Sequence, residues 1–203
     1  MKAFTDLDMA DMREYFIQLL NDIPDERMKV TREKLIEYLD KKGFFTAPAS
    51  VKYHSHVNGG LCYHSLRVLE NLKLICQMKG LNYTIDTLTI VALFHDIAKQ
   101  DFYNSYMKNV KVDGKWIQEE HMGYQDWDKR MVFGSHEENS LYLCLKLFNL
   151  TDEEACAIVN HHGGYSRKDN YEIAQVNYTY PLSCALFLAD TMSTIFDEDM
   201  IDE

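Results

Sequence analysis

Apolar residues recur at intervals of three and four along most of this chain, and this spacing is that of one face of an α-helix. The pattern is clearest in seven segments, at residues 7–20, 31–43, 60–80, 84–99, 135–148, 151–162 and 181–196. An apolar stripe on a helix is stable only when another element covers it, so these helices must pack together. The sequence therefore predicts an all-α bundle of six or seven helices.

Residues at the ends of these segments support the assignment. Thr31 stands where a helix N-cap is expected, and Gly43 follows two lysines, as at the C-terminus of a helix. Thr151 and Glu154 have the spacing of a capping box, and Pro181 lies in a first turn. These local signals place helix boundaries without reference to the periodicity.

The stretch at residues 101–133 departs from the helical pattern. Its segment VKVDGKWIQ alternates apolar and polar residues around Asp113-Gly114, the strongest short signal for a two-stranded hairpin. Helical spacing returns at residue 135. We therefore expect residues 101–133 to be an insertion that carries a small β-hairpin.

The charge of the chain limits its partners. Lys and Arg total 21 against 32 Asp and Glu, which gives a net charge of −11. Binding of duplex nucleic acid needs clustered Lys and Arg to neutralise the phosphates, so duplex nucleic acid is not expected as a partner. Residues 196–203, FDEDMIDE, hold five acids, and we expect them to form a solvated acidic tail.

Size and composition predict a single domain, residues 1–203, with no membrane span. The least polar long stretch, residues 173–189, is interrupted by polar residues and a proline. The N-terminus has acidic residues where a signal peptide needs an apolar run, so we expect a cytoplasmic protein. Five scattered cysteines without a CxxC pair predict reduced, buried thiols.

Histidines and aspartates stand in apolar segments where burial is expected. His95 and Asp96 end the apolar run of ALFHDIAK, and His64 lies within an apolar helix. Asp190, in ALFLADTMS, would cost several kcal/mol to bury as an unpaired charge, and a bound cation removes that cost. The alternative for Asp190 is a lysine partner or a helix-capping role. Imidazoles and carboxylates suit divalent Zn, Mn, Fe, Co or Ni, which predicts a metal site in the bundle.

The order of these residues resembles the HD superfamily of metal-dependent phosphohydrolases, which is named after its adjacent His-Asp pair. Three local matches carry the resemblance: GGLCYHSL around His64, LFHDIAK around His95 and Asp96, and LFLAD ending at Asp190. The resemblance spans about residues 54–190. It implies one HD-like helical domain with the hairpin as an insertion.

The resemblance also implies a ligand set. In members of the family, residues matching His64, His95, Asp96 and Asp190 hold one metal ion. His136 and His161 match the additional histidines of members that bind two metals, with Asp96 as the bridging ligand. Two ions are therefore expected rather than one. The register of IVNHHGG favours His161 over His162, although a slip by one residue would exchange them.

The implied chemistry is hydrolysis of a phosphate ester, with a metal-activated hydroxide as the nucleophile and no nucleophile from the protein. The sequence has no Ser-His-Asp pattern, no GKS or GKT phosphate loop and no GxGxxG motif. The expected substrate is a nucleotide or a nucleotide-derived phosphate ester, and a short oligonucleotide also fits. The choice between a monoester and a diester stays open.

Three basic residues close to the ligands in sequence are candidates for binding the substrate phosphate. Lys99 could offer a point charge and aid catalysis, or be an exposed lysine at the end of a helix. Arg67 could bind phosphate or pair with Glu70, and Lys52 precedes the first histidines. The insertion, rich in aromatic rings and cations, could form a lid on which a base stacks, or a small hairpin with its own satellite core.

Two other functions are compatible with the same residues. The related helical fold of the myo-inositol oxygenase type uses a six-ligand set of similar order to hold two irons, so a di-iron oxygenase is one alternative. A non-catalytic nucleotide-binding sensor is the other. A complete ligand set speaks against the sensor, because a binding module does not need all six.

Overall fold

The computed structural model describes residues 5–51, 55–126, 134–165 and 169–198 of the chain. Its α-helices are α1 (Asp6–Leu19), α2 (Arg32–Lys42), α3 (Gly60–Lys79), α4 (Ile85–Phe94), α5 (His136–Leu147), α6 (Asp152–Val159), α7 (Asn170–Thr179) and α8 (Pro181–Met192). Shorter helical segments are η1 (Leu20–Asp22), η2 (Asp25–Arg27), η3 (Ile97–Asp101), η4 (Gly163–Tyr165) and η5 (Ser193–Asp197). The strands β1 (Tyr103–Val112) and β2 (Lys115–Tyr124) form a hairpin. The prediction of a helical bundle with a small β-hairpin is confirmed.

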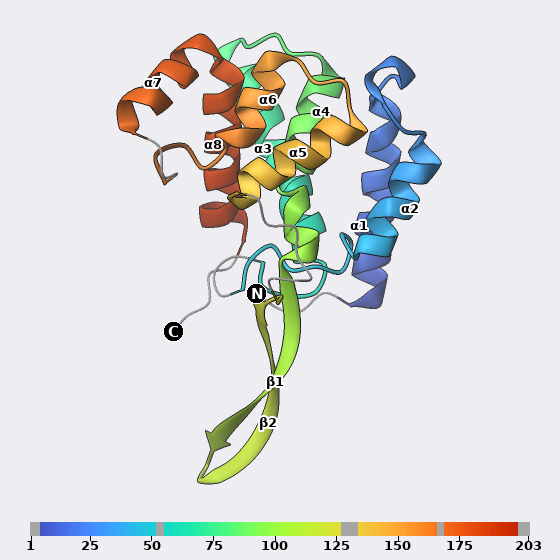
Figure 1. Ribbon diagram of the computed structural model, residues 1–203, viewed down its shortest axis with the longest axis vertical. Helices are drawn as coiled ribbons and strands as arrows, with labels where there is room; N and C mark the ends of the chain where they lie inside the picture. The colour runs from blue at the N-terminus through green and yellow to red at the C-terminus, as the bar shows by residue number, and fades with distance from the viewer. Residues whose placement is uncertain (1–4, 52–54, 127–133, 166–168, 199–203) are drawn as a thin grey trace.

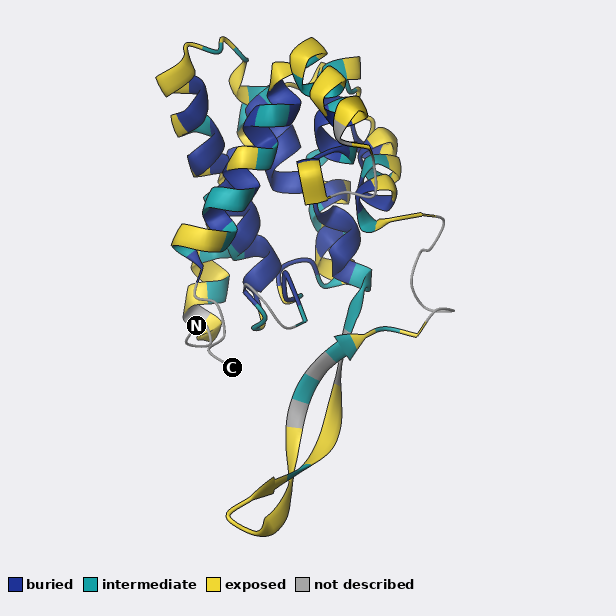
Figure 2. Ribbon diagram, turned by 90° about the vertical axis from the view of Figure 1, so that its left-hand side faces the viewer, coloured by how far each residue is buried: buried dark blue, intermediate teal, exposed yellow. Residues whose placement is uncertain are grey.

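The bundle is built around α3, which packs against α4, α8 and α1 (Figure 1). Figure 2 shows that the buried residues gather where these helices face one another. Phe16 of α1 packs its ring against Phe44 and Phe94, with ring centroids 5.2 and 5.7 Å away. Within the described ranges no helix is long and apolar enough to cross a lipid bilayer.

The start of α3 is fixed by two glycines. Gly59 has a φ of 81°, in the left-handed region where a side chain is strained. At Gly60 a Cβ atom would lie 1.9 Å from the carbonyl oxygen of Ser55, so the close approach of these backbones requires glycine. The turn sets the direction in which α3 enters the core, and with it the position of His64.

The helix α4 ends earlier than the periodicity predicts. The sequence indicates one helix over 84–99, but α4 stops at Phe94 and the 3₁₀ segment η3 begins at Ile97. Asp96, at φ −111° and ψ 16°, lies outside the helical region, and its carbonyl oxygen accepts a hydrogen bond from Lys99 N. The apolar spacing runs through both segments, so it does not reveal the break between them.

One helix more than predicted is present, since the described residues contain eight α-helices rather than six or seven. The additional helix is α7, whose sequence NYEIAQVNYT contains many residues of weak helix propensity. Asp169 caps it by accepting a hydrogen bond from Tyr171 N, and Ile173 is buried. Packing of α7 against α8 compensates for the weak local preference.

The hairpin leaves the bundle as a long arm (Figure 1). Its strands pair in antiparallel register from Tyr103 opposite Tyr124 to Val112 opposite Lys115. Asp113 and Gly114 form the turn with φ values of 50° and 81°, as the Asp-Gly signal predicts for a two-residue loop. Exposed residues dominate the part of the arm far from the bundle (Figure 2).

Candidate metal centre

Six side chains from five parts of the chain meet inside the bundle. His64 comes from α3, His136 from the first turn of α5, and Asp190 from α8. His95 and Asp96 occupy the break after α4, and His161 follows the end of α6. The side chain of His136 is 19% exposed and that of Asp190 13%, whereas the other four are within 1% of full burial. These are the six predicted metal ligands.

The first group of donor atoms lies around the Nε2 atom of His64. It is 3.2 Å from His95 Nε2, 3.2 Å from Asp190 Oδ1 and 3.6 Å from Asp96 Oδ2. His95 Nε2 is itself 3.4 Å from Asp96 Oδ2. We call this group the first position. Two nitrogens and two carboxylates therefore point at one place.

The second group lies around the other oxygen of Asp96. His136 Nε2 and His161 Nε2 are each 3.4 Å from Asp96 Oδ1. All three atoms are buried, and within the described part of the chain none has a hydrogen-bond partner. We call this group the second position. The two oxygens of one carboxylate thus face two different sets of histidines.

The separations within both groups suit donors that share a cation. Two donors that are each about 2.1 Å from one ion, and about 109° apart, are separated by about 3.4 Å. The observed separations lie between 3.2 and 3.6 Å. Buried polar atoms without partners are costly, and a cation is the group that satisfies a carboxylate oxygen and two imidazole nitrogens together. The residues therefore fit divalent ions at both positions.

The charges of the cluster also favour cations. Four buried acids, Asp96, Glu137, Asp190 and Glu198, lie in or next to the cluster, and Lys99 is the buried cation beside it. Lys99 Nζ is 2.7 Å from Asp96 Oδ2. Burial alone would raise the pKa of Asp96, but Lys99 and His95 outweigh it and hold the pKa well below its usual value. The pKa of His64 is raised to about 10 in the ion-free protein, so its ring is also positive, and two negative charges remain in excess, which favours bound cations.

Backbone carbonyls orient two of the imidazoles. The Nδ1 atoms of His95 and His161 lie 2.8 and 2.7 Å from the carbonyl oxygens of Ala92 and Ile158. A carbonyl can only accept, so in each ring Nδ1 carries the hydrogen and Nε2 is left as a lone-pair donor. Both Nε2 atoms point at Asp96. The rings are set for metal binding by local backbone contacts.

The neighbouring histidine His162 occupies a different environment from His161. Its side chain is 31% exposed, and its Nδ1 atom is 2.9 Å from Glu137 Oε1. Its ring nevertheless lies 4.6 Å from that of His136, and the ligand atoms of these three histidines are close enough to hold an ion. The contact of His161 with Asp96 agrees with the register that the family pattern favours.

Sequence reasoning missed Glu137 and misread the C-terminal acids. Glu137 Oε2 is 3.4 Å from His136 Nδ1, and the adjacent position in sequence was the available signal. The prediction of a solvated tail at 196–203 is wrong for Asp197 and Glu198, since Glu198 is 3% exposed and contacts His64. Residues 199–203 lie outside the described residues. The contacts of Asp197 and Glu198 with α3 are visible only in the tertiary structure.

The structure describes two of the three basic residues predicted to bind substrate. Lys99 is 6% exposed and paired with Asp96, so it is not the exposed lysine of the alternative interpretation. Arg67 forms ion pairs with Glu70 and Asp197. Lys52 lies outside the described residues.

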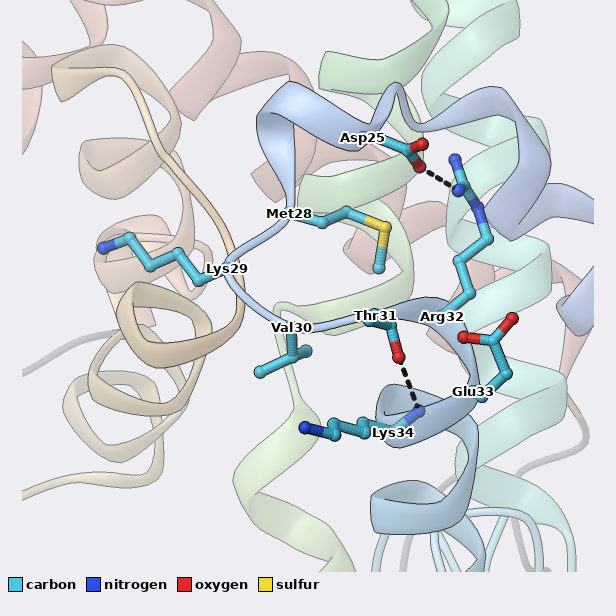
Figure 3. A pocket seen from close by; sticks show the side chains of 8 residues that line it. All are labelled: Asp25, Met28, Lys29, Val30, Thr31, Arg32, Glu33 and Lys34. Carbon is cyan, nitrogen blue, oxygen red and sulfur yellow. Dashed lines mark hydrogen bonds and ion pairs between the residues drawn. The ribbon is translucent and has the colours of Figure 1, made fainter.

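A pocket of about 570 Å³ opens elsewhere, between η2 and α2 (Figure 3). The residues that line it are Asp25, Met28, Lys29, Val30, Thr31, Arg32, Glu33 and Lys34. None of them belongs to the histidine cluster. Arg32 binds Asp25 and the carbonyl oxygens of Leu20 and Ile23, and Lys29 Nζ donates to the carbonyl oxygen of Leu145. These two cations are engaged by other parts of the chain, and the lining contains no histidine or cysteine that could hold a metal ion.

Metal binding is expected to release protons. Burial lowers the pKa of His64, but Glu198 and Asp190 outweigh it and raise the pKa to about 10 in the ion-free protein. A metal ligand must be neutral, so an ion that binds at neutral pH displaces this proton. Apparent affinity should rise about tenfold per pH unit below that pKa. Calorimetric titration of Zn²⁺ in Hepes and in Tris measures the released proton, and equal heats in both buffers would contradict the expectation.

Comparison with known proteins agrees with this geometry. The family model described as HD domain matches residues 61–195, about two thirds of the chain. No curated protein and no solved structure matches the chain. The matched range begins three residues before His64 and ends five after Asp190, so it contains all six candidate ligands. This chain belongs to the HD domain family, within the superfamily of metal-dependent phosphohydrolases.

Proposed function

We propose that this protein hydrolyses a phosphate ester of a nucleotide or a nucleotide-derived compound, with two divalent transition-metal ions held by the six ligands. The observation that carries the proposal is the arrangement of Asp96, whose Oδ2 faces His64 and His95 while its Oδ1 faces two other histidines. A carboxylate placed in this way can bridge two ions. The partnerless buried atoms of the second position support a second ion there.

The six residues would hold two divalent ions, which when bound would supply an activated water and positive charge toward a phosphoryl group. The protein residues supply the arrangement around them. Asp96 is fixed by its ion pair with Lys99, and the imidazoles are fixed by the acceptors at their Nδ1 atoms. Lys99 Nζ is a buried positive charge beside the cluster, where it can pair with a phosphate oxygen of the substrate.

Aromatic rings beside the cluster support a nucleotide as the substrate. Phe102 has its ring centroid 6.2 Å from that of His136, and the Tyr103 ring lies 5.7 Å from that of Tyr124 at the base of the arm. Tyr103 and Lys99 are close enough for the cation to lower the pKa of the tyrosine, although burial outweighs this and the pKa is raised. A base can stack on such rings while its phosphate reaches the ions.

The arm itself extends away from the bundle, so the lid hypothesis applies to its base rather than to its tip (Figure 1). Gln125 N donates to the carbonyl oxygen of Phe102 and closes the base of the hairpin. A variant in which the arm is shortened beyond Tyr106, with both ends kept, therefore distinguishes the contribution of the tip to substrate binding from that of the base. Unchanged affinity for substrate in that variant would leave the tip without a role in substrate binding.

Metal analysis of the purified protein, followed by a substrate screen, tests the proposal. The protein is loaded with Mn²⁺ and offered nucleoside mono- and triphosphates, cyclic nucleotides and short oligonucleotides. We expect product release that a chelator abolishes and added Mn²⁺ restores. Tight binding without turnover across several metals would favour the nucleotide sensor. Iron-dependent oxygen uptake with an organic substrate, and no phosphate release under anaerobic conditions, would favour the oxygenase.

A further inference from the structure

We infer that Glu198 is a positioning residue that sets the affinity of the first position by acting through His64. The inference rests on the proposed metal-dependent function and extends it to a segment outside the predicted ligands. Glu198 Oε1 lies 2.7 Å from His64 Nδ1, and both side chains are fully buried. On the other edge of the same ring, Asp190 Oδ1 lies 3.2 Å from His64 Nε2. Two carboxylates therefore hold one imidazole from opposite sides.

Both carboxylates come from one continuous segment. Asp190 lies in the last turns of α8, which is followed by the π-helical turn η5. Glu198 N donates to the carbonyl oxygen of Ser193 at 3.1 Å, five residues earlier, which is the hydrogen bond of a π-helix. The wider turn brings Glu198 back to the ring that Asp190 already contacts. Single π-turns of this kind are frequent at functional sites.

The helix that carries His64 also anchors this segment, Ser193–Glu198, which we call the C-terminal clasp. Asn71 Nδ2 donates to Ser193 Oγ at 3.0 Å and to Asp197 Oδ2 at 2.6 Å. Arg67 Nη2 lies 3.2 Å from Asp197 Oδ1. Both anchors belong to α3. His64 and the acid that orients it are thereby fixed on the same helix.

His64 differs from His95 and His161 in the acceptor at its Nδ1 atom. His95 and His161 use neutral backbone carbonyls, whereas His64 uses a carboxylate. A carboxylate partner fixes the tautomer with Nε2 free for the metal, and it increases the donor strength of the ring. Loss of such a partner typically costs 10–100-fold in metal affinity. The second position is built around Asp96 Oδ1 rather than around His64, so its ion should be retained.

The test compares full-length wild type with Glu198→Ala, Glu198→Gln and the control Glu37→Gln. Glu37, on α2, is an exposed acid, so its variant makes the same charge change away from the site. Binding of Mn²⁺ and Zn²⁺ is measured by calorimetry, bound metal by elemental analysis, and the ion-free fold by urea unfolding. We expect Glu198→Ala to lower the affinity for one of the two ions by about 10–100-fold and to leave the affinity for the other unchanged.

The glutamine variant separates orientation from folding. Its amide oxygen still accepts from His64 Nδ1, so we expect an affinity for the weakened ion between those of wild type and Glu198→Ala. Binding of two ions by Glu198→Ala with wild-type affinities would overturn the inference, and so would equal weakening of both ions. If wild type itself binds no divalent ion, the proposed function fails first, and the two failures are therefore distinguishable. Glu37→Gln should match wild type in every measurement.

Discussion

Replacement of Asp96 by Asn is expected to abolish hydrolysis and to remove both metal ions. The carboxylate contributes one oxygen to each position, so its loss should affect both. Stabilisation by metal ions contributes several kcal/mol to the transition state, which corresponds to a fall in kcat/KM of about 10³-fold or more. Steady-state kinetics with the best substrate, together with elemental analysis, measures both effects.

A double variant provides the control for misfolding. Asp96→Asn leaves the buried Lys99 without its 2.7 Å partner, which should lower the free energy of unfolding by about 3 kcal/mol. Replacing Lys99 by Met as well removes the uncompensated charge, so the double variant should recover much of that loss in urea unfolding. Activity and metal content should stay lost in the recovered protein. Metal-dependent hydrolysis by the double variant would contradict the bridging role.

The adjacent histidines give the second large prediction. His161→Ala should lose the ion of the second position, because His161 Nε2 is one of the two nitrogens beside Asp96 Oδ1. Its kcat/KM should fall at least about 10²-fold. His162→Ala should keep both ions and lose less than about tenfold, because the ring of His162 is partly exposed and bonded to Glu137. Metal content, kinetics and urea unfolding are measured on both variants side by side.

The pair serves as its own control, since both variants remove one imidazole from consecutive positions. Loss of the second ion in His162→Ala, with its retention in His161→Ala, would show that the register is shifted by one residue. Loss of the ion in both would make His162 a third nitrogen ligand, which the close approach of the three histidines allows. The prediction holds only if His161→Ala alone lacks the ion.

The sequence by itself determined the elements whose signals are local. The apolar spacing places α3 and α8, and Asp-Gly marks the turn of the arm, because helix periodicity and turn chemistry depend on residues a few positions apart. His64, His95, Asp96 and Asp190 were also accessible, because a polar or charged side chain in an apolar segment needs a partner, whereas His136 and His161 came only from the resemblance to the family. The identity of that partner came from their order along the chain.

The tertiary structure decided what depends on residues far apart. The break after Phe94 turns Asp96 so that its two oxygens face different helices, and nothing in the apolar spacing marks that break. Glu198 contacts His64, which is 134 positions away in the sequence. The prediction of a solvated tail was based on local composition, which contains no information about such a distant contact. Burial and pairing of a charge are properties of the packed bundle, and a local pattern of acids is the same whether the segment faces water or a histidine.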